Sequence, residues 1–350
     1  MMSSVLKMLF ATVVGLALGL TLTAIAGENP WHVLQVILKS AFGSRYDFGM
    51  TLGPSIPVLF TGLGVYIGLK SGLFNVGAEG QLVMGAFTYA LLGILLQGFP
   101  SWLGMALCVM GGLLVSAAWA AIPALLLNKR GAHEVITGIM LNFIAAGLTG
   151  WWTMSAIRNP ESQVAESANV DAAFRLENFS WFQDASINVS LLVGIGLVVL
   201  VSIWESNHIS GFKLNVVGSS PMVAKHAGIN SHQSKLGAFI LSGAICSLVG
   251  FNEVLGNSGK FKLDFSPGYG FTGIAVALMA RKNALGIIPA ALLFGALQKG
   301  AGDLDFETEK ITKEIAVLIQ ALVILCVASQ RLSELDIVNR ILSPFKRQKV

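Results

Sequence analysis

Residues 72–81 read GLFNVGAEGQ and lie between two long apolar stretches. PVLFTGLGVYIGLKS (57–71) precedes them and LVMGAFTYALLGILL (82–96) follows them. The three glycines disfavour one continuous helix, and Asn75 favours a turn. A helix that is broken inside a membrane exposes backbone N–H and C=O groups, which protein or a cavity must then surround. The stretch therefore predicts a membrane helix that is interrupted beside a polar space.

The composition of the whole chain supports a membrane location. Of its 350 residues, 54% are hydrophobic and only 12% are charged, whereas soluble domains carry about 25% charged residues. The longest loops have about thirty residues, too few for an independent soluble domain. We therefore predict an all-α integral membrane protein in which residues 1–350 form a single transmembrane domain.

The apolar segments predict the number of membrane helices. A helix needs about 20 apolar residues to cross a bilayer, and we expect about ten such helices, some of them broken. Their ranges are 8–26, 50–69, 82–97, 103–127, 134–156, 189–204, 236–255, 271–280, 284–300 and 314–330. The segment 271–280 is too short to cross alone and is expected to be half of a broken helix. The first segment is interpreted as an uncleaved anchor.

A weak internal repeat suggests two similar halves. TGLGVYIGLKSGLFNVGAEG (61–80) and GYGFTGIAVALMARKNALGI (268–287) share small residues, interrupted apolar runs and a basic break. Paired interrupted segments in two halves are typical of the substrate path of a transporter.

The basic residues predict the orientation in the membrane. Lys and Arg are enriched in cytoplasmic loops, and the larger basic groups share one side if both termini are cytoplasmic. These groups are Lys129 with Arg130, the loop lysines 213, 225 and 235, Arg281 with Lys282, and the tail 331–349. The segment 157–188, with five acidic and two basic residues, then lies outside. The lysines 260, 262, 310 and 313 also fall outside and oppose this scheme.

The polar residues of the interruption are candidates for a substrate path. Intramembrane ionisable groups mark functional sites by default, and Asn75, Glu79 and Gln81 can offer hydrogen bonds beside the aromatic ring of Phe74. This mixture suits a neutral polar ring compound. The alternative is that the polar side chains satisfy the broken backbone or tie helices together, and that Phe74 is ordinary packing.

A second candidate lies in GAHEVITGIMLNFIA (131–145). Asn142 lies about two turns into this span, where it can bond either a substrate or a neighbouring helix. His133 lacks a second His or Cys at ligand spacing, so we expect no metal site and no cofactor. Neither a nucleophile with a base nor a phosphate-binding GxxxxGK[ST] loop is present. We therefore expect no catalytic residues, and the energy for any transport must come from another subunit.

The loop 205–235 contains a short helix with clear start and stop signals. In NVVGSSPMVAKHAGINSHQSK (215–235), Pro221 suits the first helical turn and Gly228 ends the helix. We predict that this helix inserts into a groove on a cytoplasmic partner. The alternative is an ordinary solvated loop helix.

Four stretches resemble bacterial ABC transporter permeases, in the nucleoside and simple-sugar branch of the family that includes ribose and branched-chain amino acid permeases. They are GLFNVGAEGQLVMGA, GAHEVITGIMLNFIA, VGSSPMVAKHAGI and SPGYGFTGIAVALMARKNALGI, in order along the chain. The resemblance covers about residues 30–300. It implies a transport subunit, not an enzyme, of an ATP-driven importer for a nucleoside, riboflavin or a simple sugar.

The same resemblance implies partners and a location. It identifies the loop helix as a coupling helix that docks on an ATP-binding subunit, with Gly218, Pro221, Ala224, Ala227 and Gly228 as its residues. Further expected partners are a second permease (a paralogue or a second copy), an external substrate-binding protein or lipoprotein, and the lipid bilayer, but no nucleic acid. The expected location is the bacterial inner membrane.

An ion-coupled secondary transporter is the alternative. Such a protein would need pairs of ionisable residues within several spans. The intramembrane acidic residues Glu79, Glu134 and Glu253 are sparse and have no evident basic partner in the sequence. The sequence therefore favours the ATP-driven permease.

Overall fold

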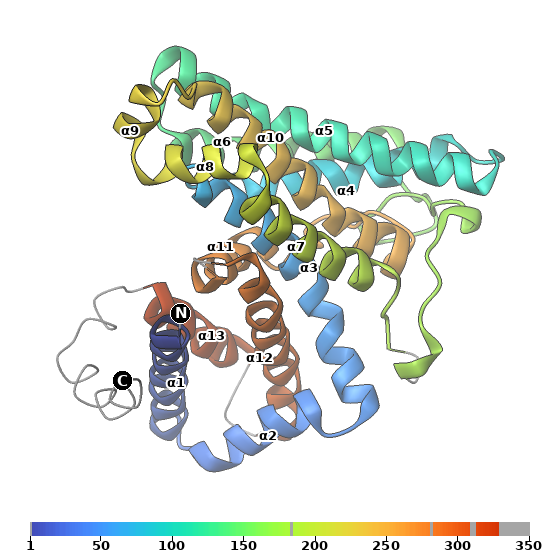
Figure 1. Ribbon diagram of the computed structural model, residues 1–350. Coiled ribbons are helices and arrows are strands. Elements are labelled where there is room, and N and C mark those ends of the chain that lie inside the picture. The colour runs from blue at the N-terminus through green and yellow to red at the C-terminus, as the bar shows by residue number, and fades with distance from the viewer. Residues whose placement is uncertain (1, 183–184, 281–282, 309–312, 329–350) are drawn as a thin grey trace. The chain divides into compact units, whose positions relative to one another are not determined.

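The computed structural model describes residues 2–182, 185–280, 283–308 and 313–328 (Figure 1). These residues are mostly helical, and each expected membrane segment coincides with a helix. The basic pair Arg281–Lys282 and the tail 331–349, on which the predicted orientation partly rests, lie outside the described residues. The described residues form two compact units, one within 1–51 and 293–350 and the other within 52–292.

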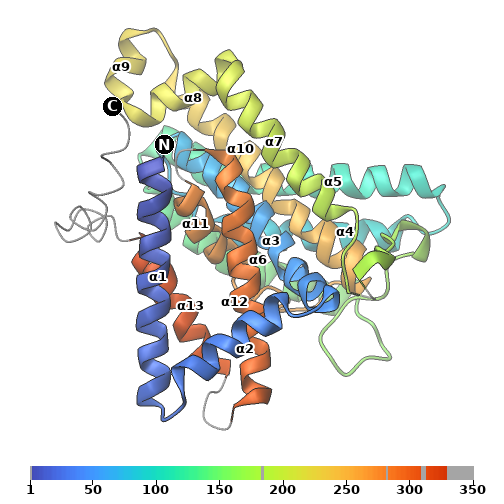
Figure 2. The ribbon, with the colours of Figure 1, turned by 60° about the horizontal axis from the view of Figure 1, so that its bottom comes forward.

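The first unit is built from the two ends of the chain. It contains α1 (Met2–Ile25), α2 (Pro30–Phe42), α13 (Lys313–Ala328), the first turns of α3 (Arg45–Lys70) and the later part of α12 (Ile287–Glu307). Gly15 and Gly19 of α1 lie directly against α13, so the two helices pack closely side by side (Figure 2). The amphipathic helix α2 starts at Pro30 after the Asn29 cap and buries its apolar face against α12.

The second unit holds the interruption and the loop helix. Its further elements are α4 (Ala78–Leu95), α5 (Ser101–Arg130), α6 (Glu134–Ala156), α7 (Ser190–Asn207), α8 (Ile209–Ser219), α9 (Pro221–His226), α10 (Ser231–Gly250), the π-helix η3 (Phe251–Ser258) and α11 (Tyr269–Ala280). Three single-turn 3₁₀ segments complete it: η1 (Ala172–Phe174), η2 (Ser180–Phe182) and η4 (Ala284–Gly286).

Small residues let α4, α5 and α10 approach one another closely. Gly250 of α10 lies against Ala86 of α4, and Gly243 of α10 lies against Ser116 of α5. The Ser116 hydroxyl bonds to carbonyls of both neighbours, Gln81 O at 2.8 Å and Gly243 O at 2.7 Å. Such contacts replace the hydrophobic driving force that membrane helices lack between themselves.

Seven helical segments among the described residues are long and apolar enough to cross a membrane. The chain is therefore a multi-pass membrane protein. Most of the span is buried in α3, in α4 and in α10 with η3, whereas only 22% is buried in each of α5, α6 and α7. The expectation of ten crossings also counts α1, α11 and α13, which these seven do not include. With 12 residues, α11 is too short to cross alone, as the sequence predicts.

The interruption at 72–81 is present as a turn between α3 and α4. α3 ends at Lys70 and α4 begins at Ala78. Gly72 has a φ of +78°, a left-handed conformation that glycine adopts without strain. A second interruption separates α10 from α11, where the π-helix η3 is followed by non-helical backbone up to Gly268. π-Helical turns occur frequently at functional sites.

Candidate functional site

A cavity of about 270 Å³ lies in the second unit where the two interruptions meet. Its lining residues come from α4, α6, the segment before α11, and the first turn of α11. They are Glu79, Val83, Ile139, Asn142, Phe143, Ala146, Thr149, Phe261, Leu263, Asp264, Phe265, Ser266 and Phe271. An apolar, aromatic wall with a few polar groups is typical of small-molecule sites.

Glu79 lines this cavity and also joins two helices. Its carboxylate lines the cavity, and Oε2 accepts a hydrogen bond of 2.7 Å from the backbone N–H of Gly270. Gly270 is in the first turn of α11, where a carboxylate is favourable because the helix dipole is positive at that end. Glu79 therefore ties α4 to α11 while its side chain faces the cavity.

Asn142 likewise both ties helices and lines the cavity. Its Oδ1 accepts a 2.8 Å bond from Gly80 N, and its Nδ2 donates a 3.0 Å bond to Val76 O. The N-cap residue of α4, Gly77, has no side chain to satisfy the free N–H groups there. Asn142 of α6 supplies that cap across the helix interface.

Asn75 and Gln81 lie in the packing and are not among the residues that line this cavity. Both are buried, and their amides bond to each other through Asn75 Nδ2 to Gln81 Oε1 (2.9 Å) and Gln81 Nε2 to Asn75 Oδ1 (3.1 Å). Asn75 Nδ2 also donates to Ser242 Oγ of α10 at 2.7 Å. Phe74 is half-buried and is likewise not part of this lining.

The aromatic and polar side chains that complete the cavity were not predicted as site residues from the sequence. Phe261, Phe265 and Ser266 belong to the second interruption, whereas Phe271 lies in the first turn of α11. Asp264, also in the interruption, has a φ of +57°, which is unusual for a residue other than glycine. The signal in the sequence was DFSPGYG (264–270), a polar and glycine-rich stretch between two apolar segments. Within the described ranges, no three His, Cys, Asp or Glu side chains form a group that could hold a metal ion.

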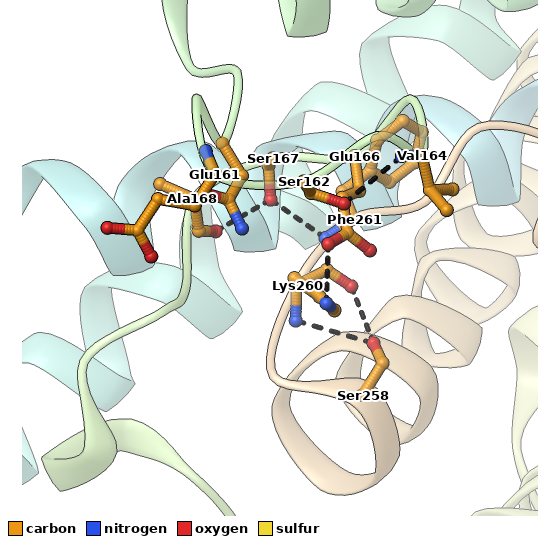
Figure 3. A network of polar contacts seen from close by, with 10 residues as sticks. Glu161, Ser162, Val164, Glu166, Ser167, Ala168, Ser258, Lys260 and Phe261 are labelled. Atoms are coloured by element: carbon orange, nitrogen blue, oxygen red, sulfur yellow. Dashed lines mark hydrogen bonds and ion pairs between the residues drawn. The ribbon is translucent and has the colours of Figure 1, made fainter.

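Polar contacts join two loops, one containing Glu166 and Ser167 and the other containing Lys260 and Phe261 (Figure 3). Glu166 and Lys260 form an ion pair with a 2.5 Å separation between Oε1 and Nζ. Ser167 N donates to Phe261 O at 2.8 Å, and Phe261 N donates to Ser167 Oγ at 2.9 Å. We call these contacts the loop clamp. Because Phe261 also lines the cavity, the loop clamp fixes part of its wall.

The ion pair of the loop clamp changes the pKa of Glu166. Glu166 is buried, and the hydrogen bond from Lys260 lowers its pKa below the ordinary glutamate value despite the desolvation that burial causes. Lys260 is one of the basic residues whose predicted position outside the membrane opposed the orientation scheme. In the loop clamp it is paired with Glu166. Its charge is neutralised within the same group of loops.

The loop helix forms as the sequence predicts. The Ser220 hydroxyl caps α9, Pro221 occupies its first turn, and Gly228 follows it with a φ of +71°. Ala224 is fully buried within this chain, whereas Met222 and Val223 are 72% and 57% exposed. Pro221, Ala227 and Gly228 are also exposed. A partner can therefore touch α9 on the face of Met222 and Val223, but not at Ala224.

Gly218 lies at the end of α8, just before α9, and packs against the start of the interruption at 72–81. A Cβ on Gly218 would lie 2.1 Å from the carbonyl oxygen of Lys70 and 2.9 Å from Gly72 N, so only glycine fits. Lys70 itself pairs with Glu205, which also accepts a 2.6 Å hydrogen bond from the Tyr66 hydroxyl. The segment that leads into α9 thus contacts the first residues of the interruption directly.

Comparisons with known proteins agree with these features. The sequence profile of the family described as "Branched-chain amino acid transport system / permease component" matches residues 48–328. The glucose ABC transporter permease protein TsgB13 of Haloferax volcanii is 32% identical over 92% of this chain and 85% of its own length. The guanosine ABC transporter permease protein NupP of Bacillus subtilis is 29% identical over 94% of both chains. The "Probable riboflavin import permease protein RfuC" of Treponema pallidum is 25% identical over 94% of this chain and 86% of its own length.

The extent of these matches assigns the chain to a family and defines its general role. Proteins of this family are permease components, so the chain is a transport subunit. The ATP that drives transport is hydrolysed by a partner subunit. The family profile matches residues 48–328, and the membrane helices and the interrupted segments at the cavity fit a transport protein. The chain therefore belongs to the family of ABC transporter permease components described for branched-chain amino acid transport systems.

Proposed function

We propose that this permease imports a neutral ring compound that carries hydroxyl groups, namely a nucleoside, riboflavin or a simple sugar. The observation that carries the proposal is the cavity, in which four phenylalanines accompany Glu79, Asn142 and Asp264. The names of the relatives, which mention glucose, guanosine and riboflavin, point to the same class of compound.

The chemistry of the wall suits such a substrate. Aromatic faces stack on a flat ring, and carboxylate and amide oxygens accept hydrogen bonds from hydroxyl or ring N–H groups. Two acidic side chains in one small cavity disfavour an anionic substrate. In this proposal Asn75 and Gln81 hold the interrupted segment in shape, while Glu79 and Asn142 contact the substrate.

The proposed coupling route runs from α9 to the cavity. The ATP-binding subunit docks on the exposed face of Met222 and Val223, next to Pro221, Ala227 and Gly228. Movement of α9 is passed through Gly218 to Lys70 and Gly72, which begin the interruption. The interruption then shifts the first turn of α4, where Asn142 and Glu79 hold the cavity wall.

The proposed topology has ten crossings in two similar halves within one permease domain, residues 1–350. Both termini and the loop 205–235 lie in the cytoplasm of a bacterial cell, on one side of the inner membrane. The Glu79–Gly270 bond ties together α4 and α11, the two helices that follow the interruptions. Contacts between loop ends, Asn128 with His232 and Glu166 with Lys260, agree with the predicted sides. A second permease and an external binding protein or lipoprotein complete the transporter.

Uptake by the complete transporter in liposomes tests the proposal. We expect guanosine, riboflavin or glucose, but not leucine, to be transported. Glu79→Gln keeps the shape of the side chain but removes its charge, so it should raise KM or change the substrate preference with normal assembly. Glu253→Gln is the matched control. Glu253 is a second carboxylate within a span, but it accepts hydrogen bonds from Asn252 and Asn257 and does not line the cavity. Transport of leucine, or a Glu79→Gln variant in which both the KM and the substrate preference are unchanged, would contradict the proposal.

A further inference from the structure

A second cavity, of about 360 Å³, is lined by residues from the end of α7, from α8 and from the start of α10. It is separate from the cavity at Glu79, because the two share no lining residue. Its wall consists of Trp204, Ser210, Lys213, Leu214, Gln233, Ser234, Gly237, Ala238 and Leu241. The proposed transport mechanism assigns no role to this cavity.

The wall of this cavity is positively charged. Among the described residues that line it, Lys213 is the only charged one, and none is a carboxylate. Among the described residues, Lys213 takes part in no ion pair, whereas the nearby Glu205 is held by Lys70 and Tyr66. Gln233 and Ser234 add neutral donors to the same wall. The cavity is therefore suited to an anionic group.

The other side of the wall is apolar and reaches the surface of the membrane helices. Leu241 is 38% exposed, and its neighbour Ile240 is exposed to the same degree. The Trp204 ring, whose Nε1 donates a 2.8 Å bond to Ser210 Oγ, stands near the end of the α7 span. Tryptophan is enriched at the boundary between membrane and water, where one side of the ring is apolar and the other polar.

We propose that this cavity binds an anionic phospholipid, with the phosphate near Lys213 and an acyl chain along Leu214, Ala238 and Leu241. Basic pockets between membrane helices bind anionic lipid headgroups in this way. A soluble phosphate compound would share the contact with Lys213 but would leave the apolar wall uncovered. The proposal does not depend on which substrate is transported or on which side of the membrane the loops lie.

Gly237 offers a way to fill the cavity without disturbing its surroundings. A Cβ placed on Gly237 would meet no atom within 4 Å, so Gly237→Leu occupies empty space. Gly196 of α7 has equally open surroundings but does not line the cavity, so Gly196→Leu is the matched control. For the charge, Lys213→Gln is compared with Lys225→Gln, which removes an exposed lysine of α9.

Native mass spectrometry of the full chain in detergent, with added phosphatidylglycerol or phosphatidylcholine, tests the proposal. We expect the wild type to retain phosphatidylglycerol preferentially, and Lys213→Gln to retain it about fivefold less, the change that corresponds to ~1 kcal/mol per basic residue. Gly237→Leu should also lose the lipid, and both control variants should keep it.

Three outcomes would overturn the proposal. The first is equal retention of the two lipids by the wild type. The second is displacement of phosphatidylglycerol by low concentrations of soluble glycerol phosphate, which would identify a site for a free phosphate compound. The third is unchanged lipid retention in both Lys213→Gln and Gly237→Leu.

Discussion

The amide pair of Asn75 and Gln81 shows how the chain stabilises a turn inside a membrane protein. The two amides donate hydrogen bonds to each other, and Asn75 Nδ2 donates a further hydrogen bond to Ser242 Oγ. A buried polar group that loses its partner costs free energy, because no water replaces the lost bond. The pair is therefore expected to matter for stability more than for substrate affinity.

Replacing Gln81 tests this role. Gln81→Leu keeps a similar volume but leaves Asn75 Oδ1 without its hydrogen-bond donor, so we expect a loss of about 1–3 kcal/mol in the free energy of unfolding. The KM of the remaining folded protein should be unchanged. Thermal unfolding and uptake assays measure the two quantities. Gln97→Leu, at an exposed position, is the control and should change neither. A raised KM in Gln81→Leu would instead place Gln81 in the substrate path.

The loop clamp predicts a dependence on acid. The pKa of Glu166 in the folded protein lies below that of an unfolded glutamate, which is about 4.3. A group with a lowered folded pKa stabilises the fold fully above the unfolded pKa, and this contribution is lost as the pH falls through the folded pKa. The loop clamp should thus be closed at neutral pH and should open only in clearly acidic solution.

Hydrogen exchange at the Ser167 and Phe261 amides, corrected for the intrinsic rate at each pH, measures this opening. We expect protection to fall as the pH drops below about 4, and Glu166→Gln to lower it already at neutral pH. Glu161→Gln, which changes an exposed carboxylate in the same loop, should behave like the wild type. Protection that does not change with pH would show that the backbone bonds alone hold the loops.

At the scale of elements, α9 presents two faces with different tasks. Ala224 is buried within the chain and anchors α9, while Met222 and Val223 project outward. Two exposed apolar side chains on a six-residue helix are expected at a protein interface, because an isolated helix of this length gains little stability of its own.

Val223→Asp separates docking from folding. A charge placed in a desolvated interface without a partner costs roughly 3–5 kcal/mol, so the ATP-binding subunit should no longer co-purify while the permease inserts normally. Ala224→Asp should instead lower the amount of folded permease, because that side chain is buried within this chain. Co-purification and size-exclusion chromatography measure the two effects. If the ATP-binding subunit still co-purifies normally with Val223→Asp, α9 is not the element on which that subunit docks.

At the scale of the whole molecule, contacts between loop ends constrain which segments share a side of the membrane. His232 Nδ1 lies 2.9 Å from Asn128 Oδ1, so the end of α5 and the start of α10 are together. The loop clamp joins 157–168 to 259–263 in the same manner. Each pair joins two segments that the basic residues predict to lie on the same side.

Cysteine labelling determines which side is which. In a background without the native cysteines, Val164→Cys should react with a membrane-impermeant maleimide in intact cells, because Val164 is 61% exposed on the predicted outer side. Lys225→Cys, exposed on α9, should react only after the membrane is permeabilised. Reaction of both cysteines after permeabilisation is the control. The reverse pattern in intact cells would invert the topology.

The sequence by itself determined the class of the protein, the positions of its helices and the places where two of them are interrupted. These properties depend on local chemistry. Too few charged residues are present to cover a soluble surface, and glycines and Pro221 set backbone conformation wherever they stand. The short capped helix α9 and the segment too short to cross alone followed from the same signals.

Only the tertiary structure decided which polar side chain faces the cavity and which faces the packing. Asn75, Glu79 and Gln81 are neighbours in sequence, yet Glu79 reaches Gly270, which is 191 residues away, while Asn75 and Gln81 turn toward each other and α10. The same holds for Ala224, whose burial depends on the helices around it. The direction of a side chain is set by the elements that pack against it, and those elements come from distant parts of the chain.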